Sequence, residues 1–286
     1  MSLEAAEQLA VQLRTIRDEA GPDFPAGSPA GRERSSYQRP ESISTLNGQA
    51  IVLAEAAADN LEALITLVRL GKLAVAPWVT ARATLEATSQ AIWLLDPAIS
   101  IEERVGRSLG LRYRSLRAQE TLFREKAMAE SLEAVHRRME DVERVAMTLG
   151  FSKQRTKADK LSGIGLPRPD LTSLVASLLG STDLYRILSG VAHGDVGVLN
   201  QLCSKVIRDE GAEGVILVRS PASGLLMMLV SKVTQVYART EWLMILRFGG
   251  DTDKAKAILE EKFNELKFRD TEDVRFWRSA IARPSS

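Results

Sequence analysis

Long runs of apolar residues at helical spacing constrain the fold of this 286-residue chain more than any other feature of its sequence. From Ser42 onward, apolar side chains recur three and four positions apart for most of the remaining length, which is the spacing of one helix face. Gly71 follows one of the longest runs at the position after a helix cap. A strand-like pattern is convincing only near residues 214 to 219, which is too short to imply a sheet. The sequence therefore predicts an all-α protein.

The predicted helices divide the chain into four segments. A helix over residues 1 to 20 comes first, and the proline-rich residues 21 to 41 are interpreted as a flexible linker. We expect residues 42 to 268 to form a single extended helical-bundle domain, followed by a tail over residues 269 to 286. Within the bundle, the fifty residues that begin at the capping serine Ser100 predict one very long helix or two helices joined by a bend.

Charge and cysteine content narrow the class of protein. The chain carries 38 basic and 37 acidic residues, so it lacks the basic excess of an obligate nucleic-acid binder. Its single cysteine, Cys203, cannot form an intrachain disulfide, is interpreted as a small core residue, and belongs to no cluster with zinc-site spacing. The sequence shows neither a secretory signal nor an apolar run of about 18 residues that could span a membrane. We expect a cytoplasmic protein with no metal, no cofactor and no membrane partner.

One stretch, LYRILSGVAHGD at residues 184 to 195, gathers polar side chains that suit catalysis. Arg186 and His193 are seven positions apart and share a helix face, and Ser189 lies on the same side within reach of the imidazole. A neutral histidine can take a proton from a hydroxyl, while an arginine stabilises developing negative charge. This combination suits metal-free phosphodiester cleavage, in which a ribose 2′-hydroxyl attacks the adjacent phosphate. Alternatively, Ser189 and His193 bridge neighbouring helices while Arg186 binds a carboxylate.

A second polar pair, Arg82 and Glu86, lies four residues apart on a helix that we expect at the centre of the bundle. Burial of such a pair is costly unless each charge is satisfied. One interpretation is an internal ion pair that fixes the register of the helix. The other is that Glu86 orients His193 or Arg186 across the bundle core.

Basic residues in two further regions could contact a phosphate backbone. One region is an arginine stripe expected on the solvent side of the helix that follows Ser100, and the other is a basic loop predicted over residues 151 to 169. A solvated face without a ligand is the alternative. His136 is expected to be exposed and inert. The candidate nucleic-acid contacts are Arg104, Arg107, Arg114, Lys153, Arg155 and Lys157.

Two segments, RATLEATSQAIWLLDP and YRILSGVAHG, together resemble uncharacterised bacterial helical proteins related to the HEPN superfamily. The nuclease motif of that superfamily is an arginine, four to six residues and a histidine, which Arg186 and His193 match at the long limit. The resemblance covers residues 45 to 200 and implies a helical-bundle core, to which this chain adds N- and C-terminal helices. It makes Arg186 and His193 candidate catalytic residues. Active members place a polar residue directly after the arginine, whereas this chain has Ile187.

Two hypotheses about function follow from these residues. The first is a metal-independent endoribonuclease of HEPN type, acting on RNA as a toxin or defence effector, with His193 as general base or acid and Arg186 stabilising the transition state. The alternative is a non-catalytic helical protein that binds a protein partner or a ligand and in which the Arg–Ser–His cluster is structural. The resemblance and the apolar segment LLMMLV at residues 225 to 230 both favour a homodimer.

Overall fold

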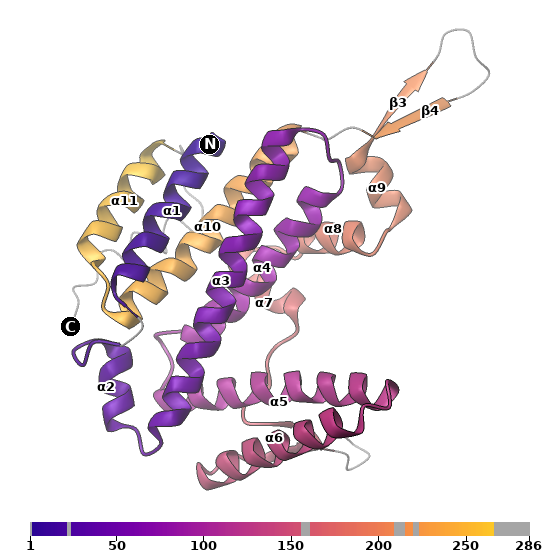
Figure 1. Cartoon of the computed structure of the whole chain (residues 1–286). Helices are drawn as coiled ribbons and strands as arrows, with labels where there is room; N and C mark the ends of the chain where they lie inside the picture. The colour runs from indigo at the N-terminus through magenta and orange to yellow at the C-terminus, as the bar shows by residue number, and fades with distance from the viewer. Residues whose placement is uncertain (1, 22–23, 156–160, 209–214, 220–222, 266–286) are drawn as a thin grey trace. The chain divides into compact units, whose positions relative to one another are not determined.

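The computed structural model of the chain describes residues 2–21, 24–155, 161–208, 215–219 and 223–265. Over these residues the protein is an all-α helical bundle with eleven helices, and its four short strands form two separate hairpins (Figure 1). The fold class predicted from helical spacing is confirmed. The tail predicted over residues 269 to 286 lies outside the described residues.

The chain forms two compact units. The first unit comprises Met1–Arg32, Ile51–Trp93 and Leu171–Ser286, and the second comprises Glu33–Ala50 and Leu94–Asp170. Three helices have residues in both units: α2 (Pro29–Ser36), α3 (Pro40–Leu70) and α4 (Ala76–Leu95). The other helices of the first unit are α1 (Leu3–Glu19), α7 (Leu171–Leu179), α8 (Asp183–Ala192), α9 (Val196–Cys203), α10 (Ser223–Phe248) and α11 (Thr252–Glu265).

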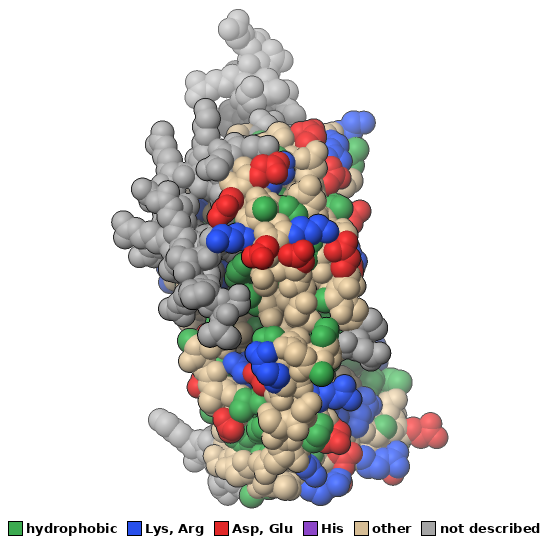
Figure 2. Space-filling view, turned by 90° about the vertical axis from the view of Figure 1, so that its left-hand side faces the viewer, with side chains coloured by type: hydrophobic (Ala, Val, Ile, Leu, Met, Phe, Trp, Pro, Cys, Tyr) green, Lys and Arg blue, Asp and Glu red, His purple; other side chains and the backbone are tan. Residues whose placement is uncertain are grey.

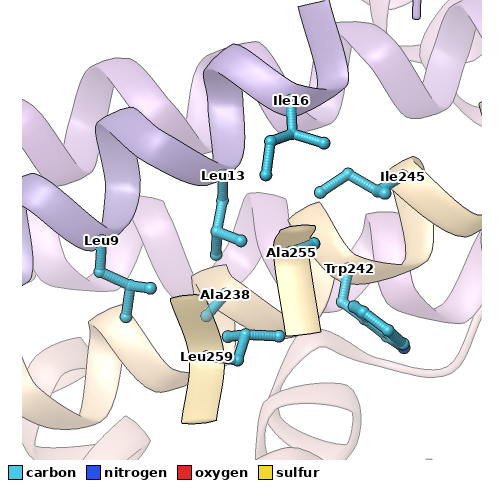
Figure 3. Packing of buried hydrophobic residues seen from close by; sticks show 8 residues of the cluster. All are labelled: Leu9, Leu13, Ile16, Ala238, Trp242, Ile245, Ala255 and Leu259. Carbon is cyan, nitrogen blue, oxygen red and sulfur yellow. The ribbon is translucent and has the colours of Figure 1, made fainter. Parts of the chain in front are cut away.

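Helix α1 belongs to the core of the first unit. The Ser2 hydroxyl caps the helix by accepting a hydrogen bond from the backbone N–H of Ala5. Three large apolar side chains of α1 recur at helical spacing and pack against α10 and α11 (Figure 3). The cluster consists of Leu9, Leu13, Ile16, Ala238, Trp242, Ile245, Ala255 and Leu259. Burial of these side chains holds the N-terminal helix in the unit.

The second unit is built on an antiparallel helix pair, α5 (Ile101–Glu125) and α6 (Ala129–Thr148). The two-helix interpretation of this fifty-residue stretch is therefore confirmed, and Ser100 caps α5 through the backbone N–H of Glu103 as its sequence predicts. Gly106 and Gly110 have no side chains, so they leave room for another segment against one side of α5. The backbone around Leu166 lies there, and its N–H donates to the Gly106 carbonyl over 2.9 Å.

The strands were predicted incompletely. The expected fragment is β4 (Val215–Arg219), which pairs with β3 (Ser204–Arg208), and a second hairpin joins β1 (Lys153–Arg155) to β2 (Leu161–Ile164). The second hairpin corrects the prediction of a basic loop over residues 151 to 169. Strands of three to five residues are too short to show a reliable alternation of apolar and polar residues. Similarly, α2 falls within the segment interpreted as a linker.

Two further features of the described residues bear on the class of protein. None of their helices combines the length and apolar character needed to cross a bilayer. Cys203 is buried, as expected of a core residue, and its thiol donates a hydrogen bond to the carbonyl oxygen of Ala74 over 3.2 Å.

Candidate functional site

The end of helix α8 fixes the backbone of His193. His193 is the C-cap residue, and Gly194 follows with a φ of +74°, in the left-handed region that favours glycine. The N–H of Asp195 donates to the Gly190 carbonyl, and the N–H of Gly194 donates to the Val191 carbonyl. This pair of bonds is a Schellman motif, which ends helix α8 at His193. The His193 side chain is therefore attached at a defined helix terminus.

The side chains of α4 meet those of α8 in a polar cluster, which we call the α4–α8 cluster. It consists of Arg82, Glu86, Tyr185 and His193. The Arg82 Nε donates to Glu86 Oε1 over 2.7 Å, and the Tyr185 hydroxyl donates to the same oxygen over 2.7 Å. The Arg82 Nη1 lies 3.3 Å from Nε2 of His193. The Arg82 guanidinium carbon also lies 5.6 Å from the centre of the Tyr185 ring.

These contacts hold Arg82 as a fixed cation. Burial opposes its charge, but the hydrogen bond and the negative charge of Glu86 outweigh that effect and raise the pKa of Arg82. Burial and the hydrogen bond to Glu86 likewise raise the pKa of Tyr185, so its hydroxyl remains a donor. The Arg82–Glu86 pair is only partly buried, with side chains 20% and 24% exposed, so the cluster is accessible from solvent.

The contact with Arg82 restricts which nitrogen of the neighbouring imidazole can be an acceptor. A guanidinium has only donors, so a hydrogen bond to His193 requires Nε2 to be the acceptor. In that arrangement Nδ1 is the ring nitrogen that carries a proton. A neutral histidine is the form that accepts a proton during general base catalysis.

The structure contains the Arg82–Glu86 ion pair that one interpretation expected, but it gives His193 a different partner. Glu86 binds Arg82 and Tyr185 rather than His193 or Arg186. Ser189 contacts His193 through its backbone carbonyl, which accepts the His193 N–H over 3.0 Å. Arg186 is exposed, with no hydrogen-bond or ion-pair partner among the described residues. The imidazole of His193 thus contacts a neighbouring helix through Arg82, and the structure shows no hydrogen bond between it and the Ser189 hydroxyl among the described residues.

Tyr185 is the member of the cluster that sequence reasoning missed. It lies on the buried face of α8 with Leu188 and Val191, so its position is typical of a core aromatic residue. Its partner Glu86 is 99 positions earlier in the chain. One signal could have indicated this contact. A tyrosine on the apolar face of a helix needs a hydrogen-bond partner for its hydroxyl when it is buried, so Tyr185 implies an acceptor nearby.

Several of the predicted nucleic-acid contacts in the second unit are engaged in ion pairs. Arg104 is 8% exposed, forms an ion pair with Glu33 and donates to the Ile99 carbonyl over 2.9 Å. Arg107 pairs with Glu103 over 2.7 Å. The prediction of a solvent-facing arginine stripe is therefore wrong for Arg104. Its side chain turns inward because Glu33 on α2 and the Ile99 carbonyl, just before α5, are its partners.

The remaining predicted nucleic-acid contacts are less constrained. Arg114 is exposed, while Lys153 pairs with Glu143 over 2.5 Å. Lys157 and the side chain of Arg155 lie outside the described residues. On the face of the protein shown in Figure 2, acidic and basic side chains lie next to one another. His136 is exposed as expected, although its Nε2 lies 3.3 Å from Glu120.

Among the described residues, no three or more histidine, cysteine, aspartate and glutamate side chains are grouped so that they could hold a metal ion. Comparisons of the chain with protein-family models, curated proteins and solved structures find nothing similar.

Proposed function

We propose that this chain is a metal-independent endoribonuclease whose reaction centre is the α4–α8 cluster together with Arg186. The observation that carries the proposal is the 3.3 Å contact between the exposed His193 imidazole and the Arg82 guanidinium. This contact joins a proton acceptor to a fixed cation, which are the two groups that metal-free phosphodiester cleavage requires. Arg186 adds a second cation on the same helix as His193.

The reaction begins when an RNA phosphate takes the donor group of Arg82 and so frees Nε2 of His193. The imidazole accepts the proton of the ribose 2′-hydroxyl, and the 2′-oxygen forms a bond to phosphorus. The bond between phosphorus and the 5′-oxygen breaks, and that oxygen receives a proton from the imidazolium. The products are a 2′,3′-cyclic phosphate and a 5′-hydroxyl. Arg82 and Arg186 stabilise the negative charge that develops on the phosphoryl oxygens.

The proposal includes a cellular setting. An endoribonuclease of this kind acts on RNA in the cytoplasm as a toxin or defence effector, and we propose that it acts as a homodimer. Leu225 and Met228, at the start of α10, support the homodimer because their side chains are 42% and 54% exposed and offer apolar surface to a second copy. Light scattering at micromolar protein concentration tests this part, and a monomer would contradict it.

Incubation of the protein with end-labelled RNA in EDTA tests the reaction. We expect cleavage products that end in a 2′,3′-cyclic phosphate. His193→Ala should lower the rate roughly 100-fold or more, the usual scale of general acid–base catalysis. Arg82→Gln and Arg186→Ala should each lower it by removing a charge-stabilising group. His136→Ala is the matched control, because it removes the only other histidine and should leave the rate unchanged.

The same variants address the non-catalytic alternative. The Arg82–His193 contact also links α4 to α8, which is what a structural cluster would do. In that case the parent protein cleaves no RNA, and the only effect of His193→Ala is a lower melting temperature. His193→Gln would then restore part of the stability, because its amide can accept the hydrogen bond from Arg82.

A further inference from the structure

A small pocket in the second unit lies between the start of α3, the middle of α5 and the end of α6. Its volume is about 80 Å³, well below the size of a site that encloses a whole small molecule. Apolar side chains from α5 and α6 contribute to its lining, namely Val105, Leu109 and Val145. The pocket therefore fits one chemical group of a ligand and leaves the remainder of that ligand in solvent.

Four of the polar residues that line the pocket carry hydrogen-bond donors without partners among the described residues. Arg39, directly before α3, and Arg112 on α5 both line it. Neither guanidinium has a hydrogen-bond or ion-pair partner within the part of the chain that the structure describes. The hydroxyls of Ser42 and Thr45, which line it from α3, are also without partners among those residues. This differs from Arg104 and Arg107, which lie earlier on α5 and are ion-paired.

Two other polar residues complete the lining. The Ser108 hydroxyl donates to the side-chain carbonyl of Gln49 over 2.7 Å, so this group is already used. Glu41 lies exposed in the first turn of α3, where its carboxylate offsets one of the two arginine charges. The pocket still has a net positive charge, and the start of the 31-residue helix α3 adds the positive end of its dipole.

We propose that this pocket binds a phosphate group. Two arginines, a serine and a threonine line this one small cavity, and the donors that they carry match the charge and the several acceptor oxygens of a phosphate. The phosphate comes from inorganic phosphate or from a small phosphomonoester, whose organic part would remain outside the cavity. The site lies within the second unit and does not depend on the cleavage reaction proposed for the α4–α8 cluster.

Isothermal titration calorimetry of the full chain tests the site with three probes: inorganic phosphate, a 5′-mononucleotide and acetate. We expect phosphate to bind and acetate to bind more weakly, because a carboxylate offers fewer acceptor oxygens. A mononucleotide that binds much more tightly than inorganic phosphate identifies a phosphomonoester as the ligand. The opposite order identifies the free ion.

Four variants assign the binding to the pocket. Arg39→Gln and Arg112→Gln should each raise the dissociation constant roughly tenfold or more, because each removes a charge-assisted hydrogen bond. Arg114→Gln is the matched control, since it removes an exposed arginine two positions further along α5 and should change the constant little. Glu41→Gln should lower the dissociation constant several-fold, because it removes a negative charge that repels the phosphate. Circular dichroism of each variant verifies that the helices remain folded.

The proposal is overturned if neither inorganic phosphate nor the mononucleotide binds at millimolar concentration. It is equally overturned if Arg114→Gln weakens binding as much as Arg112→Gln does, because the effect would then come from net charge rather than from the pocket. Tighter binding by Glu41→Gln together with loss in the two pocket arginine variants supports it.

Discussion

Arg17 and Glu241 form an ion pair that is almost fully removed from solvent. The Nη1 atom of Arg17 on α1 lies 2.9 Å from Oε1 of Glu241 on α10, and the two side chains are 5% and 0% exposed. Arg17 also forms ion pairs with Glu55 on α3 and with the neighbouring Asp18. Because a buried charge is costly without a partner, this arginine makes the position of α1 depend on electrostatics as well as on apolar packing.

Removal of Arg17 should therefore destabilise the protein. We expect Arg17→Met to lower the free energy of unfolding by about 3 kcal/mol at pH 8, because the buried Glu241 carboxyl must then either keep a charge without its cation or take up a proton. Arg14→Met is the matched control on the same helix. Arg14 contacts Glu55 over 2.8 Å, but both side chains are 38% exposed, so its loss should cost about 1 kcal/mol or less. Equal losses in urea unfolding of the two variants would contradict a special role for the buried pair.

The stability contributed by Glu241 should fall as the pH rises. Burial raises the pKa of its carboxyl from 4.5 to about 7, while Arg17 and the Tyr237 hydroxyl act in the opposite direction. Between pH 4.5 and about 7, the Glu241 carboxyl therefore holds its proton more tightly in the folded protein than in the unfolded chain. The contribution is therefore fully present below about pH 4.5 and is lost as the pH rises through about 7.

Urea unfolding at a series of pH values measures this effect as the difference in stability between the parent and Glu241→Gln. Relative to Glu241→Gln, we expect the parent to lose roughly 3 kcal/mol of its free energy of unfolding from pH 4.5 to above pH 7. This is the scale that a pKa change of this size implies. A difference that stays constant over this range would show that Glu241 ionises as easily in the folded protein as in the unfolded chain.

Two glycines in the second unit should respond to alanine in opposite ways. A Cβ on Gly110 in α5 would lie 2.3 Å from the Leu166 carbonyl oxygen, so Gly110→Ala must displace backbone and should cost about 1–3 kcal/mol. A Cβ on Gly48 in α3 would meet nothing within 4 Å. Gly48→Ala should therefore stabilise the helix by about 0.5–1 kcal/mol. Melting temperatures that move in the same direction would show that residue 166 does not pack against α5 in this way.

Local signals in the sequence were sufficient to predict most of the helices. Ser100 has the hydroxyl that begins a helix, and Gly71 tolerates the positive φ that ends one, and both act where they were expected. The β1–β2 hairpin could not be predicted, because strands of three and four residues give too few positions for a periodic pattern. The packing of α1 against α10 was missed for a different reason: the prolines that follow α1 suggested a linker, whereas the apolar face of α1 finds its partner more than 200 positions later.

The candidate site shows the limit of spacing within one helix. Spacing correctly placed Arg82 and Glu86 within reach of each other. It could not show that Tyr185 binds Glu86, or that His193 meets Arg82 rather than Ser189, because these contacts join α4 to α8 across more than 90 positions of chain. Arg104 illustrates the same limit, since its burial depends on Glu33, 71 positions earlier.

The contact with Arg82 makes a prediction about His193 that holds whether or not the protein is an enzyme. At alkaline pH, where imidazole rings are neutral, ¹⁵N NMR should find His193 mainly with its proton on Nδ1, because Nε2 accepts from Arg82. Arg82→Met removes that donor and should move the population toward the Nε2–H form. The chain has only two histidines, so the signal of His136, which lies beside Glu120 in the second unit, is an internal control that should not change. If Nε2–H predominates in the parent and Arg82→Met leaves the population unaltered, Arg82 does not donate to His193 in solution. In that event the imidazole would have no fixed cation beside it, and the α4–α8 cluster would lose the feature on which its proposed chemistry depends.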